Sequence, residues 1–113
     1  MRATSLLRQL GLRLTLFTRA NCSLCDDAKV VLERVRIHRR FEYAEIDVMA
    51  TGNGKWKALY EFDTPVVHID QAKDLNGASQ GEGTTALAKK LMHSFNEAQL
   101  RTAMDEVEHN KAD

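Results

Sequence analysis

The sequence predicts a single α/β domain in which a strand, a helix and a second strand surround a pair of cysteines. Residues 12–17 alternate leucine with other side chains, which is the period of two expected of a strand. Residues 25–35 place apolar side chains at helical spacing, and residues 41–48 return to alternation. Cys22 and Cys25 lie between the first strand and the helix, and a CxxC pair in this setting favours a redox fold over a metal site.

The bulk composition describes one small domain without a marked affinity for polyanions or lipid. The chain has 113 residues, of which 43% are hydrophobic, enough for a core of its own. Lysine plus arginine equals aspartate plus glutamate at 16 each, so no net charge attracts nucleic acid or a membrane surface. No apolar run approaches the roughly 18–20 residues that span a bilayer. We therefore expect neither nucleic acid nor a membrane as a partner.

Residues 1–11 form a basic segment ahead of the first strand. Arg2 and Arg8 occur here, the first acidic residue is Asp26, and three leucines share one helical face. This pattern resembles a short mitochondrial presequence, and the alternative is an ordinary basic lead-in to the strand. We expect residues 1–11 to be a targeting or disordered segment before a domain over residues 12–110. The single CxxC pair indicates a reducing compartment, in agreement with a cytoplasmic or mitochondrial location.

The spacing of the two cysteines suits thiol–disulfide chemistry. Cysteines three residues apart on the first turn of a helix are neighbours, so a disulfide between Cys22 and Cys25 needs little backbone movement. The free N–H groups and the positive dipole end of that helix would stabilise a thiolate on Cys22. Such settings lower a cysteine pKa from about 8.5 to roughly 3.5–7.5. We therefore expect Cys22 to be the exposed nucleophile, and Cys25 to be the less exposed thiol that resolves a mixed disulfide.

Other uses of the same cysteines stay open at this point. They could form half of a zinc site, supply thiolates to an iron–sulfur cluster that bridges two chains, or be inert thiols of a structural adaptor. A zinc site needs a second cysteine pair or two closely spaced histidines, and the chain has two cysteines and scattered histidines. We therefore expect no metal site within one chain and no tightly bound cofactor.

The middle of the chain predicts a second helix and a third strand. Residues 55–62 have helical spacing with aromatic weight, and Trp56 is expected in or near the core. Pro65, the only proline, opens a strand over residues 66–70, where its missing N–H forfeits one ladder bond. Residues 71–85 are polar and contain three glycines, which predicts a flexible loop.

The last part of the chain predicts a further helix. Residues 87–95 fit either a helix or a strand, because their apolar side chains satisfy both periods. Asn96 and Gln99 then occupy the positions of a capping box at a helix start. An apolar stripe from Leu100 to Val107 continues that helix.

These segments resemble the glutaredoxins and the wider thioredoxin fold. The stretches LTLFTRANCSLCDDAKVVLE and FDTPVVHI, with a tryptophan–tyrosine helix between them, are most similar to a divergent group of small eukaryotic glutaredoxin-like proteins. The resemblance extends over residues 12–70. It implies an α/β, thioredoxin-like fold with a four-stranded mixed sheet (β-α-β-α-β-β-α) flanked by helices. Residues 91–95 would then be the fourth strand, in a hairpin with residues 66–70, and residues 71–86 a loop insertion.

The resemblance also implies a site and a reaction. In glutaredoxins the proline before the third strand is cis and faces the cysteines, which assigns Thr64, Pro65 and Val66 to a substrate-facing turn. Cys22 would be the nucleophile and Cys25 the resolving thiol of a thiol–disulfide oxidoreductase.

Two more residues stand near the positions at which glutaredoxins hold glutathione. Arg19 replaces a lysine before the cysteine pair, and Glu97 is the acidic residue after the fourth strand, without the usual Gly-Gly pair. Ser23 and Leu24 replace the usual Pro-Tyr between the cysteines. The resemblance implies a disulfide-containing protein or a glutathione mixed disulfide as partner, glutathione as co-substrate, and a monomeric protein.

Overall fold

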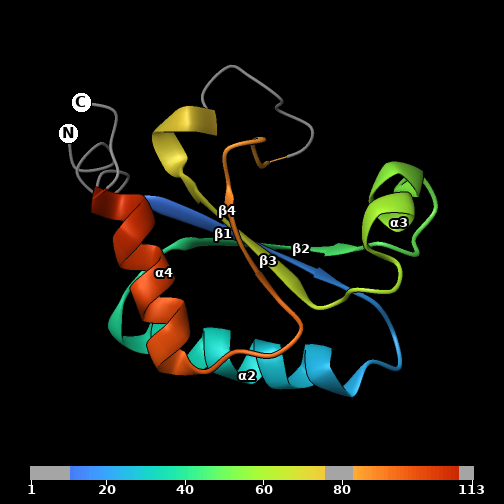
Figure 1. Cartoon of the computed structure of the whole chain (residues 1–113), viewed down its shortest axis with the longest axis horizontal. Coiled ribbons are helices and arrows are strands. Elements are labelled where there is room, and N and C mark those ends of the chain that lie inside the picture. The colour runs from blue at the N-terminus through green and yellow to red at the C-terminus, as the bar shows by residue number, and fades with distance from the viewer. Residues whose placement is uncertain (1–10, 76–82, 110–113) are drawn as a thin grey trace.

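The computed structural model describes residues 11–75 and 83–109 and shows strands alternating with helices (Figure 1). In chain order its elements are β1 (Leu12–Thr18), α2 (Ser23–His38), β2 (Glu42–Asp47), α3 (Gly54–Tyr60), β3 (Val66–Gln71), the 3-10 helix η1 (Ala72–Leu75), β4 (Lys89–Met92) and α4 (Glu97–His109). Apart from Gly11, the predicted basic segment lies outside the described residues. Within the two described ranges, no helix is both long enough and apolar enough to cross a membrane.

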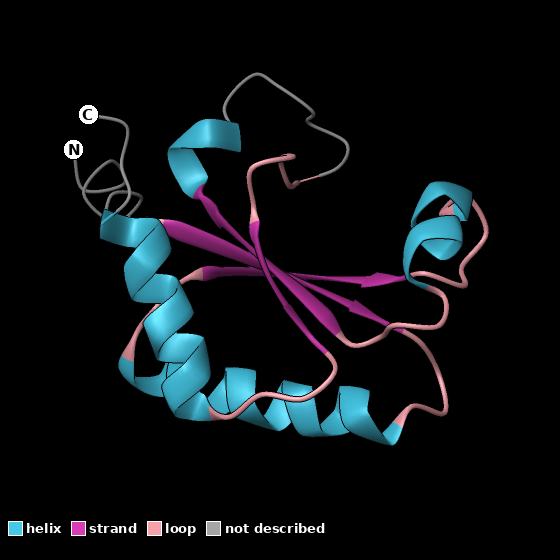
Figure 2. Cartoon of the chain, in the orientation of Figure 1, coloured by secondary structure: helices cyan, strands magenta, loops and turns pink. Residues whose placement is uncertain are grey.

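The four strands form one mixed sheet, as the family resemblance implies (Figure 2). Their spatial order is β2-β1-β3-β4, with β1 parallel to β2 and the other two neighbouring pairs antiparallel. The parallel pair is joined through α2, the kind of crossover that a parallel pair requires. Helices α2 and α4 pack on one face of the sheet, and α3 packs on the opposite face.

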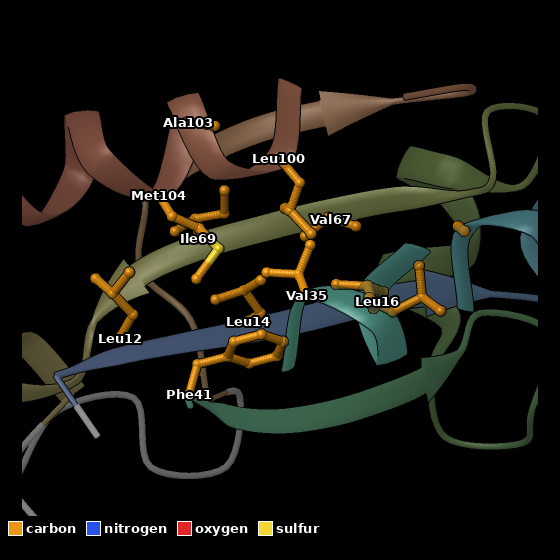
Figure 3. Close-up of a cluster of buried hydrophobic side chains, with 12 residues drawn as sticks. Leu12, Leu14, Leu16, Val35, Phe41, Val67, Ile69, Leu100, Ala103 and Met104 are labelled. Carbon is orange, nitrogen blue, oxygen red and sulfur yellow. The ribbon is translucent and has the colours of Figure 1, made fainter. Parts of the chain in front are cut away.

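The larger core lies between the sheet and the two long helices (Figure 3). Alternate residues of β1 point to this face, and Val67 and Ile69 of β3 join them. The helices supply the opposing side chains, which are Ala28, Leu32, Val35, Leu100, Ala103 and Met104. The helical spacing of both segments therefore reflects apolar stripes that are buried against the sheet.

A smaller, aromatic core covers the opposite face beneath α3. Phe17 of β1 is fully buried, and its ring centroid lies 4.5 Å from that of Trp56 and 5.2 Å from that of Tyr60. Trp56 is partly buried in this cluster, which confirms its predicted place near the core. Val66, which pairs with Phe17 across the sheet, is fully buried in the same cluster. This core fixes the end of β1 beside the start of β3.

Of the predicted flexible loop over residues 71–85, the structure describes residues 71–75 and 83–85, and residues 76–82 lie outside the described residues. Strand β3 extends to Gln71, and η1 follows it directly. At the far end of the connection, the hydroxyls of Thr84 and Thr85 donate to the carboxylate of Asp70 at 2.6 and 2.7 Å. The polar composition of the described parts therefore serves to anchor the chain to β3.

The fourth strand ends earlier than predicted. It spans Lys89–Met92 instead of residues 91–95, and its pairing with β3 ends where Met92 faces Val66. His93 follows with a φ of 70°, a conformation that turns the chain out of an extended strand. The alternation over residues 91–95 is therefore not a strand signal beyond Met92.

The predicted capping box is present at the start of α4. The side-chain oxygen of Asn96 accepts the N–H of Gln99 at 2.8 Å, and the side-chain oxygen of Gln99 accepts the N–H of Asn96 at 2.9 Å. Two amides that the helix leaves without an internal partner are satisfied in this way.

Replacing Asn96 by alanine is expected to lower the free energy of unfolding by about 1 kcal/mol, because it leaves a first-turn amide without its acceptor. Urea denaturation of the oxidised protein measures this change. Gln99→Ala removes the reciprocal bond and leaves the Asn96 cap in place, so it should cost less. An Asn96→Ala protein as stable as the wild type would show that the capping box adds nothing to stability.

Candidate functional site

Cys22 is the N-cap residue of α2. It follows a short loop in which Asn21 has a positive φ of 59°, a conformation that asparagine tolerates better than most residues. The Cys22 sulfur accepts the N–H of Cys25 at 3.1 Å, and the Cys22 carbonyl accepts the N–H of Asp26 at 3.2 Å. The sulfur thus occupies the position of a capping oxygen, at the positive end of a helix of 16 residues.

Cys22 and Cys25 are joined by a disulfide, with their Cα atoms 5.2 Å apart. The two sulfurs differ in access, since Cys22 is half-buried and Cys25 is only 1% exposed. Leu24, between them in the sequence, is 44% exposed and is not part of the buried core. A reagent from solvent would therefore meet Cys22 first.

The turn before β3 lies against Cys22. The Thr64–Pro65 peptide bond is cis, and the Thr64 hydroxyl oxygen lies 3.9 Å from the Cys22 sulfur. Thr64 is half-buried, whereas Pro65 and Val66 are buried. The fold therefore places the turn that contains Thr64, Pro65 and Val66 beside Cys22, which is bonded to the buried Cys25.

The other two predicted site residues are placed differently. Arg19 lies in the loop before Cys22, and its guanidinium donates to the carbonyl of Glu61 at 2.8 Å, which ties this loop to the end of α3. Glu97 lies on α4, with its carboxylate 3.8 Å from Arg34 and 3.5 Å from Arg101. Arg34 is 12 residues after Cys22, about 18 Å along the α2 axis. The structure does not bring Glu97 to the cysteines.

His93 and Asp63 join the site, and the sequence pattern did not single them out. The His93 amide donates to the Pro65 carbonyl at 2.8 Å, and its Nε2 lies 3.3 Å from the Asp63 carboxylate. Thirty residues separate these two side chains in the chain, so no local spacing could have linked them. They meet because β4 pairs with β3 next to the Thr64–Pro65 turn.

A buried chain of hydrogen bonds runs along the α3 side of β3. The Thr84 hydroxyl donates to the Asp70 carboxylate, so it accepts from Nδ1 of His68 at 3.0 Å. In the neutral imidazole with its hydrogen on Nδ1, the Nε2 atom accepts the Tyr60 hydroxyl at 2.6 Å. His68 is only 3% exposed, and the neutral imidazole satisfies every hydrogen bond of this network.

The pKa values of His68 and Tyr60 agree with the roles that the two side chains have in this hydrogen-bond network. Burial, followed by the positive charge of Lys90, lowers the pKa of His68 to about 4, against an opposing effect of Asp70. Burial and then the charge of Asp63 raise the pKa of Tyr60, which keeps its hydroxyl a donor. The network fastens the β3–β4 connection and α3 to the sheet behind the site.

Across residues 11–75 and 83–109, no group of three or more His, Cys, Asp or Glu side chains is placed to hold a metal ion. The two cysteines of these ranges are paired with each other in the Cys22–Cys25 disulfide.

Comparison with protein families agrees with this arrangement. Residues 13–105 match the family described as "Glutaredoxin-like domain (DUF836)". The chain belongs to this glutaredoxin-like family. The matched residues include both cysteines and the turn beside them, so the family resemblance expected from the sequence is confirmed.

Solved structures share the fold of this glutaredoxin-like chain. The protein XcR50 from X. campestris has a TM-score of 0.56 and 21% identity, over 81% of this chain and 95% of that one. A thioredoxin from Fasciola hepatica has a TM-score of 0.54 and 18% identity, over 94% and 90% of the two chains. A thioredoxin from Thermus thermophilus has a TM-score of 0.57 and 16% identity, over 93% and 82%. These similarities confirm the predicted thioredoxin-like α/β fold.

Proposed function

We propose that this glutaredoxin-like chain is a thiol–disulfide oxidoreductase that exchanges two electrons between its two cysteines and a disulfide substrate. The observation that carries the proposal is the pairing of unequal sulfurs. Cys22 caps a helix and is partly exposed, while Cys25 is buried and bonded to it. An accessible sulfur stabilised by backbone N–H groups suits a nucleophile, and a buried neighbour suits a resolving thiol.

The proposed reaction starts from the reduced protein. The Cys22 thiolate attacks one sulfur of the substrate disulfide, forms a mixed disulfide and releases the other sulfur as a thiolate, which takes up a proton. Cys25 then loses its proton and attacks the Cys22 sulfur, so the Cys22–Cys25 disulfide forms and the second substrate thiol leaves. The substrate gains two electrons and the protein loses them. An external thiol reduces the protein disulfide again, and glutathione is our proposed co-substrate.

The turn beside Cys22 supports a role in binding the substrate. Thr64 is half-buried, and its hydroxyl oxygen lies 3.9 Å from the Cys22 sulfur. A substrate bonded to Cys22 would therefore lie close to this turn. We propose that the Thr64–Pro65 turn contacts the chain on either side of the substrate disulfide. Val66, which is fully buried, would hold the turn from the core side, and Arg19 would hold the loop before Cys22.

The proposal is tested by turnover with two disulfides and excess glutathione. The substrates are insulin, as a polypeptide disulfide, and the mixed disulfide of glutathione with 2-mercaptoethanol. We expect the wild-type protein to exceed a Cys22→Ser/Cys25→Ser double variant by about 100-fold or more with at least one of them, a modest acceleration for an enzyme. Equal rates for the two proteins with both substrates would refute the proposed function.

A further inference from the structure

His93 has a backbone conformation that is uncommon for residues other than glycine. Its φ of 70° lies in the left-handed region, which glycine adopts freely and which a Cβ atom disfavours. Packing in the core does not explain why a histidine occupies this position, since its side chain is 56% exposed. An unfavourable conformation held at the edge of a candidate site is a reason to look for a role of the side chain that occupies it.

The contacts of His93 flank the residue that touches Cys22. Its amide donates to the carbonyl of Pro65 at 2.8 Å, and its Nε2 lies 3.3 Å from the carboxylate of Asp63. Thr64 lies between these two anchored residues, with its hydroxyl 3.9 Å from the Cys22 sulfur. His93 therefore holds the turn from both sides of Thr64.

His93 also borders a small hollow next to the cysteines. The hollow has a volume of about 160 Å³ and is lined by Leu24, Asp27, Ala28, His93, Ser94 and Phe95. Sites that enclose a whole small ligand usually measure about 300–1,000 Å³, so this one suits a single side chain of a longer molecule. One of the lining residues, Leu24, directly precedes Cys25 in the sequence. The hollow therefore adjoins the segment that carries the disulfide.

We infer that His93 is a positioning and specificity residue for polypeptide disulfides. Its amide and imidazole hold the Thr64–Pro65 turn in place, and His93 lines the hollow that would receive a residue flanking the substrate disulfide. This inference rests on the proposed function. It goes beyond that function because it separates substrates that carry a polypeptide chain around the disulfide from those that do not.

The test compares His93→Gly with the wild type on insulin and on bis(2-hydroxyethyl) disulfide, which has no flanking residues. Glycine suits the backbone conformation, so the variant should melt no lower than the wild type. We expect kcat/KM for insulin to fall roughly fivefold, mainly through a higher KM, which is the size of effect of one net hydrogen bond. The rate with the small disulfide should change less than about twofold, since Cys22 keeps its own contacts.

Asp63→Ala shows whether the imidazole acts through the turn. The single variants and the His93→Gly/Asp63→Ala double variant should lose a similar amount of activity towards insulin, because both remove the same interaction. His109→Ala, at the far end of α4, is the matched control and should behave as the wild type. Unchanged turnover of insulin by His93→Gly, or an equal loss with both substrates, would overturn the inference while the proposed function stands. Inactivity of the wild type towards both substrates would instead remove the proposed function itself.

Discussion

Replacing Cys22 by serine is expected to reduce disulfide turnover to about one thousandth of the wild-type rate or less. A serine hydroxyl stays protonated at neutral pH and cannot form the mixed disulfide that begins the proposed reaction. The helix start would be preserved, because serine is itself a good N-cap residue and can accept the Cys25 amide as the sulfur does. Thermal unfolding of the reduced proteins checks that the fold is kept, so a loss of turnover can be assigned to chemistry.

Cys25→Ser gives the matched result that distinguishes the two roles. This variant keeps the accessible thiol of Cys22 but lacks the neighbour that would displace the substrate. Incubated with oxidised glutathione, it should accumulate as a mixed disulfide on Cys22, whereas the wild type should proceed to its internal disulfide. Mass spectrometry of the intact protein detects the added glutathione. If Cys22→Ser were the variant that traps the adduct, the assignment of nucleophile and resolving thiol would have to be exchanged.

Local periodicity was sufficient to predict most of the helices and strands, whereas the four-stranded mixed sheet was reached through the family resemblance. The alternation in β1 and the apolar stripes of α2 and α4 depend on which face of each element is buried, and that is written in residues a few positions apart. The capping box at Asn96 was predicted for the same reason, since its two hydrogen bonds join residues three apart. The end of β4 was predicted wrongly because it depends on the pairing of Met92 with Val66, a contact across the sheet.

The candidate site was predictable only in part from the residues themselves. The cysteine spacing pointed directly to a disulfide, but the turn that contacts Cys22 lies 42 residues away and was reached only through the family resemblance. His93 has no neighbour in the sequence that signals its contact with Asp63. Glu97 was assigned by the same resemblance, and its contacts with Arg34 and Arg101 place it along α2 instead of at the cysteines. Residues that act through long-range contacts are therefore the ones that a single sequence leaves hidden.

The buried His68 should make the protein less stable as the pH falls below neutral. Its pKa is about 4 in the folded state, because burial and Lys90 oppose protonation, and about 6.5 when the chain is unfolded and solvated. Between these two values the unfolded chain binds a proton that the folded chain does not, so each pH unit lost favours unfolding by about 1.4 kcal/mol. The effect begins near pH 6.5 and is complete near pH 4, for a total of about 3 kcal/mol.

His68→Gln isolates this contribution from that of the carboxylates, which also titrate towards pH 4. Glutamine has no charge to gain, so the variant should be less stable than the wild type at pH 7, where hydrogen bonds to Tyr60 and Thr84 are weakened or lost, but should lose less stability towards pH 4. Urea denaturation of the oxidised proteins at several pH values gives both slopes. His38→Gln, the same change at an exposed histidine near the end of α2, should retain the wild-type slope. Parallel curves of stability against pH for His68→Gln and the wild type would mean that His68 binds its proton equally in the folded and unfolded states. The hydrogen-bond network that joins Tyr60, His68, Thr84 and Asp70 would then tolerate the charged imidazole.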